Sequence, residues 1–204
     1  GKKSNFFLIF QADNLFNNGI GHESLFSGNE TLHAENDSDC RKIYNSVMQT
    51  LFRVSVRIVN EEEVAEDLVH DSLIKMREKK LVFPSMDDAK FWLIRVVKNA
   101  SLNYAKRKAR EKRAYEKALR EDTRKVESGE TELLKAEAIK KTKAALDKLP
   151  ENLKMVLILR EYAELNYKEI GRVLGITEGN VKVRVFRARE QLAKLIGEND
   201  VYLP

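Results

Sequence analysis

The residues with the most specific chemistry form a stripe near the middle of the chain. It begins at Trp92 and continues at spacings of 3, 4, 4, 3 and 4, which places its members on one face of a helix. Cations bind phosphates, an aromatic ring stacks on bases and amides bond to base edges, so this face is typical of binding to separated DNA strands. A core tryptophan beside an ordinary solvated face is the alternative. The stripe consists of Trp92, Arg95, Asn99, Asn103, Lys106 and Arg110.

A segment of opposite charge precedes this stripe, and its candidate residues are Glu63, Asp67, His70 and Asp71. The three carboxylates lie four positions apart and therefore share one helix face. No nucleophile, phosphate-binding loop or metal-ligand spacing accompanies them, so we expect no catalytic residue, no metal, no cofactor and no enzymatic activity. A solvated face is the simplest explanation, and a docking face for a basic partner is the more specific one.

A third group lies near the carboxyl end, in a segment with helix-turn-helix spacing. We expect Gly175 to adopt the positive φ of a tight turn, and Gly171 to leave room for a close approach of the second helix. In a recognition helix, Arg and Lys favour guanine edges and Glu accepts from cytosine. A solvated basic helix on a bundle is the alternative. The candidate DNA contacts are Glu178, Asn180, Lys182, Arg184 and Arg187.

The elements that position these residues are predicted to be helices. No glycine lies between Gly28 and Gly129, and Pro84 is the one proline in that interval. A β-sandwich or barrel needs turn residues far more often, so the fold class is predicted to be all-α. Apolar residues recur at helical period over residues 43–58, 65–76 and 93–104, and again in the last third of the chain. Helix N-caps are predicted at Asn60, Ser85, Asn166 and Thr177.

Charge and composition divide the chain into parts. The net charge is +5, but residues 1–39 carry −4 and the remainder +9. Residues 1–39 are expected to be an irregular or mobile extension, and 198–204 a tail. We predict two small helical domains, over residues 40–113 and 131–197, joined by a flexible charged linker at 114–130. The helix-turn-helix lies in the second domain.

Cysteine usage and the amino end bear on location. Cys40 is the single cysteine, so no internal disulfide or cysteine zinc cluster forms, and a reducing cytoplasm is the expected compartment. The apolar run at residues 6–10 is shorter than a signal-peptide core or a membrane span.

Several short motifs occur in a fixed order along the chain, and together they resemble one family. The chain is similar to bacterial RNA polymerase sigma factors of the sigma-70 class, in the small extracytoplasmic-function (ECF) group. The resemblance covers region 2 at about residues 40–113 and region 4 at about 131–197. It rests on residues 65–71 (AEDLVHD), 91–99 (FWLIRVVKN), 149–150 (LP), 167–170 (YKEI) and 179–189 (GNVKVRVFRAR).

The resemblance implies a role for each candidate group. The acidic helix would dock on the clamp helices of the polymerase β′ subunit, and the stripe from Trp92 to Arg110 would recognise and melt the −10 promoter element. Residues 80–88 correspond to the loop that captures a flipped base, and the helix-turn-helix corresponds to the −35 reader. The linker would thread toward the active-site channel and the RNA exit path of core RNA polymerase, whose β and β′ subunits are the expected partners of the protein.

The resemblance also implies partners and limits. Core RNA polymerase, promoter DNA and an anti-sigma factor are the expected partners, with no small-molecule substrate. The family usually has Ala where Gly171 stands, and Ser and His where Val183 and Phe186 stand. The alternative function is a helix-turn-helix regulator whose amino-terminal helices sense a signal or dimerise. Such a regulator has no need of the stripe on the middle helix.

Overall fold

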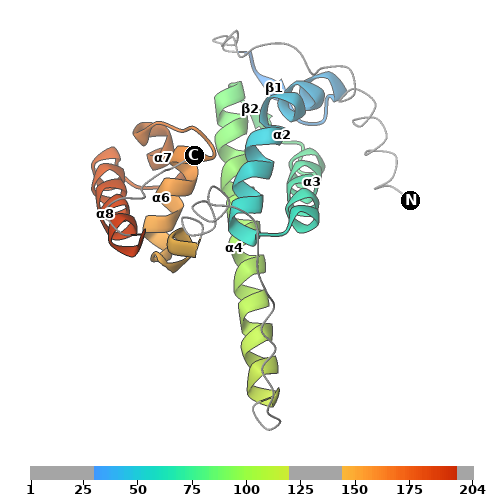
Figure 1. Cartoon of the computed structure of the whole chain (residues 1–204). Helices are drawn as coiled ribbons and strands as arrows, with labels where there is room; N and C mark the ends of the chain where they lie inside the picture. Colours follow the sequence, from blue (N-terminus) through green and yellow to red (C-terminus); the bar gives the residue numbers. More distant parts are fainter. Residues whose placement is uncertain (1–29, 120–143, 197–204) are drawn as a thin grey trace, which may run out of the picture.

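Helices dominate the computed structural model, which describes residues 30–119 and 144–196 (Figure 1). The predicted all-α fold with a helix-turn-helix is confirmed, with a two-residue strand pair added to it. Residues 144–148 are also helical. The helices and strands, in chain order, are β1 Leu32–His33, α2 Asp37–Val59, α3 Glu62–Glu78, β2 Val82–Phe83, α4 Met86–Leu119, α6 Glu151–Glu161, α7 Tyr167–Leu174 and α8 Glu178–Ile196.

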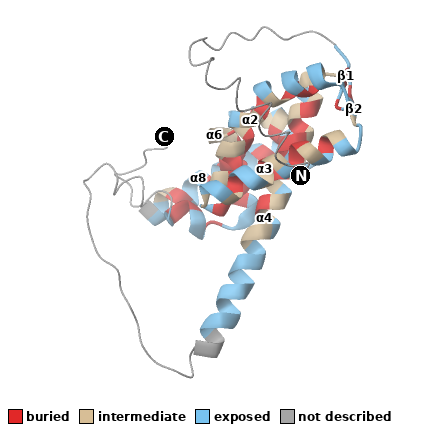
Figure 2. Ribbon diagram, turned by 90° about the vertical axis from the view of Figure 1, so that its right-hand side faces the viewer, coloured by how far each residue is buried: buried red, intermediate tan, exposed pale blue. Residues whose placement is uncertain are grey.

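Parts of the predicted organisation lie outside the described residues. These are positions 1–29 of the extension, 120–130 of the linker, 131–143 of the second helical domain, and Gly197 with the tail at 198–204. Residues 114–119 belong to α4, so this helix continues past its predicted end at about residue 113. Residues 106–116 of α4 are exposed, and this part of the helix projects from the other helices (Figures 1 and 2).

Helices α2, α3 and α4 pack around a shared apolar core. The α2 stripe predicted from its spacing is buried, since Ile43, Val47, Leu51 and Val54 have no exposed surface. One polar pair lies inside this packing, where the hydroxyl groups of Ser55 and Ser101 are 2.9 Å apart. Because each buried hydroxyl has a partner, the pair joins α2 to α4 without a desolvation penalty for an unmade bond.

The predicted caps are confirmed at three of four positions. The Asn166 side chain accepts from Glu169 N, and the Glu169 carboxylate accepts from Asn166 N, which completes a capping box. Ser85 Oγ accepts from Asp88 N at 3.2 Å, and Thr177 Oγ1 accepts from Asn180 N at 3.3 Å. Asn60 was predicted to cap α3, which is wrong. It ends α2 instead, with a φ of 59°, and Glu61 precedes α3 without a side-chain cap.

The amino-terminal part of the described chain also differs from prediction. Residues 30–39 were expected to be irregular or mobile up to a helix start near residue 37. In the structure, Leu32 and Ala34 are buried and β1 pairs antiparallel with β2. Asn36 then caps α2 by accepting from Ser38 N and Asp39 N. This short segment is therefore a packed part of the first helical group.

Helices α6, α7 and α8 form the second group. Gly175 has a φ of 69°, as predicted for the tight turn between α7 and α8. A Cβ on Gly171 would lie 2.7 Å from Ile176 O, so the requirement for a residue without a side chain is confirmed. The atom that approaches is a carbonyl of the turn itself, and the first amide of the second helix, Glu178 N, lies farther away at 3.7 Å.

Candidate nucleic-acid interface

The predicted stripe runs along one side of α4. Its five polar members, Arg95 to Arg110, are exposed, whereas Trp92 is half-buried. The Trp92 ring lies 5.9 Å from the Phe83 ring, centroid to centroid, at a tilt of 56°. The indole is therefore supported from behind by β2, with part of its surface left accessible. Both of the alternatives for Trp92 are thus partly met, because the ring packs on the core and also borders the polar face.

A cavity of about 460 Å³ opens beside Trp92. This volume lies within the range of pockets that accept small molecules or single planar groups. The backing residues come from β2 and its neighbouring loop, and the opposite side comes from α4 and α7. Its lining residues are Leu81, Val82, Phe83, Pro84, Asp88, Phe91, Trp92, Arg95 and Arg172.

Helix α7 lies against the amino-terminal half of α4. The Arg95 guanidinium donates to two carbonyl oxygens near the end of α7, those of Arg172 at 2.5 Å and Val173 at 3.2 Å. The negative end of a helix dipole favours a cation there. In return, Arg172 pairs with Asp88 at 2.7 Å, and its guanidinium lies 4.7 Å from the centre of the Phe91 ring. These contacts close one side of the cavity with a residue from the second helical group.

Further ion pairs join the two helical groups. Arg53 pairs with Glu164 at 3.0 Å, and Lys106 of the stripe pairs with Glu151 at 3.0 Å. Arg57 is 3% exposed and lies 3.3 Å from Asp147. In each of these three pairs the first group supplies the cation and the second group the carboxylate. The surface of the first group that packs against the second is therefore basic, and it includes Arg95 and Lys106 of the predicted stripe.

Lys98 lies on the same helix between these contacts. Burial lowers its pKa, the neighbouring charge of Arg95 lowers it further, and Glu151 acts in the opposite direction. A partly buried ammonium beside another cation gains from an approaching anion. This face of α4 thus favours a polyanion wherever the second helical group does not cover it.

The acidic candidates lie on α3. Glu63, Asp67 and Asp71 are exposed and His70 is half-buried, as expected for one solvent-facing line. Glu62 and Glu66 add to the same negative surface. Among the described residues, neither Glu63 nor Asp67 forms an ion pair, so this charge faces solvent. The negative charge of this surface suits a basic partner. The acidic surface lies on α3 and the stripe on α4, so the two charged surfaces are on different helices.

Helix α8 divides by face as its spacing predicts. Val181, Val185, Ala188 and Leu192 are buried. Asn180 and Arg187 lie on the exposed side, whereas Arg184 is half-buried on one flank. Lys182 and Glu178 pair at 2.9 Å along the other flank, and this hydrogen bond raises the pKa of Lys182. The five residues predicted to contact DNA are therefore spread over the exposed side of α8 and both of its flanks, and they do not form a single line.

Two exposed apolar residues of this surface were not among the predicted DNA contacts. Val183 is 48% exposed and Phe186 is 71% exposed. Both fall between the buried positions of α8, so the helical period that identified the core could also have placed them outside. Phe186 borders a groove of about 530 Å³ together with Tyr167 and Arg189. Apolar side chains beside cations can contact thymine methyl groups in a major groove.

The other additions come from tertiary packing. Phe91 and Arg172 border the cavity but belong neither to the predicted stripe nor to the loop at residues 80–88, whereas Phe83 and Asp88 lie in that loop. Within residues 30–119 and 144–196, no group of three or more His, Cys, Asp or Glu side chains could hold a metal ion. None of the helices in these same ranges is long and apolar enough to cross a membrane.

Comparison with known families identifies both helical groups. Residues 43–111 match sigma-70 region 2, and residues 140–192 match sigma-70 region 4. The chain is 30% identical over 149 residues to the ECF RNA polymerase sigma-E factor of Haemophilus influenzae, covering 69% of this chain and 78% of that protein. It is 27% identical over 171 residues to the ECF RNA polymerase sigma factor SigM of Bacillus subtilis, covering 78% and 97%.

Solved structures with the same fold cover both helical groups. The sigma factor RpoE of Bartonella quintana, in complex with the anti-sigma factor NepR, has a TM-score of 0.56 at 21% identity. That match covers 79% of this chain and 99% of RpoE. CnrH in complex with the cytosolic domain of CnrY has a TM-score of 0.55 at 19% identity, covering 80% and 91%.

Proposed function

The chain belongs to the ECF group of sigma-70-class RNA polymerase sigma factors, and on this premise we propose that it recognises −35 and −10 promoter elements and promotes DNA strand opening. Residues 40–113 would dock on core polymerase and read the −10 element. Residues 131–197 would read the −35 element, with residues 114–130 as the linker. We place this activity in the cytoplasm, where the polymerase acts.

The observation that carries the proposal is the cavity beside Trp92. An aromatic ring, a hydrophobic wall and nearby cations together accept a base that has left its stack, and the neighbouring stripe binds the phosphates that flank it. Unstacking a base costs a few kcal/mol, which stacking in the pocket and phosphate contacts offset. A duplex-binding regulator has no use for such a pocket, which weighs against the alternative of a sensing or dimerising domain.

Docking on core polymerase would use the α3 carboxylates. Glu63, Asp67 and Asp71 present their charge to solvent, with His70 at their edge. A complementary basic surface on the polymerase would accelerate association and exclude wrong partners. The proposed site on the polymerase is the pair of clamp helices in the β′ subunit, with the β subunit contacting the rest of the bound factor.

The packing of α7 on α4 limits when the stripe on α4 could bind −10 DNA. Arg95 and Lys106 contact region 4 in this arrangement, so −10 DNA and region 4 would compete for these two side chains. Docking on polymerase would therefore separate the two regions before the strand binds. An anti-sigma factor is a proposed further partner. The two structural neighbours described above were both solved in complex with another protein, which for RpoE is the anti-sigma factor NepR.

A pair of charge variants tests this division of labour. Asp71→Arg is expected to weaken binding to core RNA polymerase about a hundredfold, since like charges meet across a docking surface. It should leave the affinity of the protein for −35 duplex DNA intact. Arg184→Ala should do the reverse. Core-polymerase affinity can be measured by fluorescence anisotropy and duplex affinity by gel shift. Unchanged polymerase affinity in Asp71→Arg would overturn the docking assignment.

A further inference from the structure

A short segment ahead of the region 2 match holds the loop beside the cavity. Residues 30–36, named the strap here, precede residue 43, where the match to region 2 begins. Leu32 pairs with Phe83 and His33 with Val82 in the antiparallel β1–β2 ladder. Ala34 N then donates to Leu81 O at 2.8 Å. Successive strap residues are thus bonded to successive residues of the loop that forms one cavity wall.

The side chains of this ladder follow the alternation of a strand. Directly opposed residues of an antiparallel pair share one face of the sheet. Leu32 and Phe83 are 2% and 5% exposed, so their shared face is buried, whereas His33 and Val82 face solvent. Phe83 in turn packs against Trp92 at 5.9 Å between ring centroids. A chain of contacts therefore runs from the strap through Phe83 to the indole that borders the cavity.

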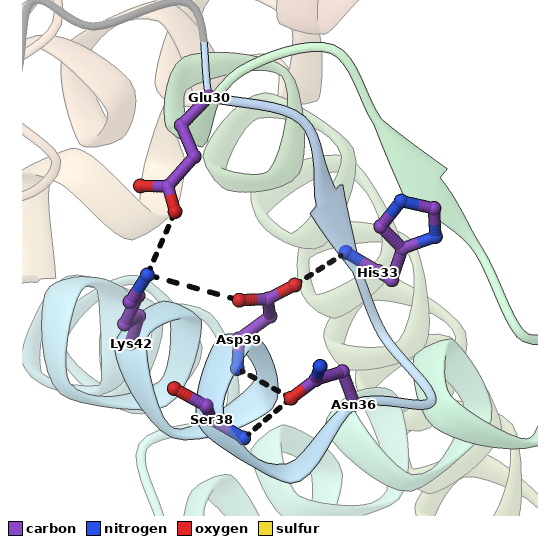
Figure 3. A network of polar contacts seen from close by, with 6 residues as sticks. All are labelled: Glu30, His33, Asn36, Ser38, Asp39 and Lys42. Atoms are coloured by element: carbon purple, nitrogen blue, oxygen red, sulfur yellow. Dashed lines mark hydrogen bonds and ion pairs between the residues drawn. The ribbon is translucent and has the colours of Figure 1, made fainter.

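The strap is also fixed along its length to α2 by a polar network (Figure 3). His33 N donates to Asp39 Oδ2 at 3.0 Å, and Lys42 pairs with Glu30 at 2.9 Å. Lys42 also lies 3.8 Å from Asp39 Oδ1. Asn36 closes the turn, because its Oδ1 accepts from Ser38 N at 2.8 Å. The strap is consequently bound on one side to the start of α2 and on the other side to the loop.

The loop itself needs such support. Lys80 adopts a φ of 50°, a left-handed conformation that costs a residue with a side chain about 1–2 kcal/mol. The Lys80 ammonium pairs with Glu35 of the strap at 3.2 Å. An exposed pair of this kind contributes little on its own. The ladder and the buried Leu32–Phe83 contact supply most of the restraint.

We propose that the strap is a positioning element for −10 recognition, which holds residues 81–84 and Trp92 in the arrangement that accepts an unpaired base. This inference rests on the proposed function, and it adds a part that the region 2 match does not contain. Leu32 is the central positioning residue, since it is the strap side chain that backs Phe83. The ligand class is single-stranded DNA with a base extruded toward the cavity.

A spectroscopic signal reports on the strap directly. Trp92 is the only tryptophan in the chain, so tryptophan fluorescence, excited selectively over that of the tyrosines, comes from the cavity wall alone. In the full-length protein, Leu32→Ala is expected to make Trp92 about twofold more accessible to acrylamide quenching. Leu51→Ala is the matched control, because Leu51 is equally buried but lies about 20 Å along α2 from its start. It should lower stability without changing the quenching.

The functional arm uses the full-length protein bound to core RNA polymerase. The probe is duplex DNA with a short randomised single-stranded overhang, and the readout is base enrichment after selection. Leu32→Ala should reduce the preference at one overhang position about tenfold, which is the loss of one stacked base. Leu32→Met keeps the volume and should restore it. Asp39→Ala, which removes the hydrogen bond from His33 N to α2 without creating a core cavity, should shift both readouts in the same direction by a smaller amount, and it serves as the test if Leu32→Ala fails to fold.

The outcomes separate the two hypotheses. Equal quenching and equal base preference in Leu32→Ala, Asp39→Ala and the Leu51→Ala control would overturn the strap as a positioning element. No base preference in the unsubstituted protein would contradict the proposed function instead. In that case the quenching of Trp92 still decides whether the strap holds the cavity wall.

Discussion

The two proposed DNA-binding faces of this molecule differ in what covers them. On α4, Arg95 and Lys106 contact the second helical group, and Trp92 rests on Phe83. On α8, Asn180, Val183, Phe186 and Arg187 are exposed. One face is occupied by protein and the other is open to solvent. From this difference we expect the α8 face to be available to duplex DNA in this arrangement, and the α4 face to become available to separated strands when the second helical group moves away.

The chemistry of the two faces differs in the same direction. The α4 face combines a cavity, an aromatic ring and separated cations, which suits bases that have left the duplex. The α8 face mixes cations with exposed apolar side chains, which suits base edges in a major groove. A substitution that affects one face can therefore be compared with the unchanged behaviour of the other.

The largest expected effect removes the α8 face as a whole. In Gly171→Val, the added side chain meets the Ile176 carbonyl, since even a Cβ would lie 2.7 Å from that oxygen. Overpacking of this kind costs about 3 kcal/mol, at the upper end of its usual range. Hydrogen exchange should show lost protection in α7 and α8, with protection in α2 and α3 retained.

Gly179→Ala is the control for this glycine substitution. No atom lies within 4 Å of a Cβ on Gly179, and the residue is helical, so Ala should stabilise region 4 by up to about 1 kcal/mol. Unchanged protection of α7 and α8 in Gly171→Val would show that the turn adapts to a side chain, and that the close approach does not define this face.

A smaller effect is expected from one exposed arginine of α8. Arg187→Ala should weaken binding to −35 duplex DNA about tenfold, because an arginine that pairs with a guanine contributes about 1–3 kcal/mol. Arg189→Ala provides a same-type control two positions on, since its guanidinium turns back to Glu161 at 3.4 Å. Gel shift with the isolated protein measures both. Equal losses in the two variants would indicate charge alone and not a specific contact.

The smallest effect concerns the contact between the two regions. Glu164→Arg should repel Arg53 and loosen region 4 from α2, without altering any residue of the stripe. The Arg53 and Glu164 side chains are 38% and 63% exposed, so the pair contributes at most about 1 kcal/mol. Affinity of the free protein for single-stranded DNA should therefore rise about threefold. Fluorescence anisotropy with a labelled oligonucleotide measures it.

The control is a double variant in which the charges of the Arg53–Glu164 ion pair are exchanged. Arg53→Glu combined with Glu164→Arg should return the affinity for single-stranded DNA to its starting value. An increase that persists in the double variant would mean that the added arginine binds DNA itself. The covered face of α4 would then not be limited by its packing against region 4.

Sequence reasoning succeeded where the signal is local. The buried stripe of α2, the capping box at Asn166 and the left-handed Gly175 all depend on residues a few positions apart. Asn60 was misassigned because Asn is favourable both as an N-cap and in the left-handed conformation that ends a helix. The residue type is correct for a boundary, but it does not say which of two adjoining helices it serves.

The missing parts depend on contacts between distant residues. The β1–β2 ladder joins Leu32 to Phe83 through two-residue strands, which are too short for a periodic pattern. Arg172 reaches Asp88 and Phe91 only because α7 packs on α4. No spacing rule within either helix contains that information. The aromatic and cationic stripe could be predicted, whereas the cavity beside it required the fold.

Promoter-dependent run-off transcription tests the central claim most directly. Core RNA polymerase is combined with the full-length protein and a library of promoter fragments, and transcripts are sequenced to locate their starts. The account predicts defined starts downstream of paired −35 and −10 sequences, which disappear with Asp71→Arg and with Trp92→Ala. A folded protein that binds duplex DNA but yields no transcript above that of core polymerase alone would contradict it.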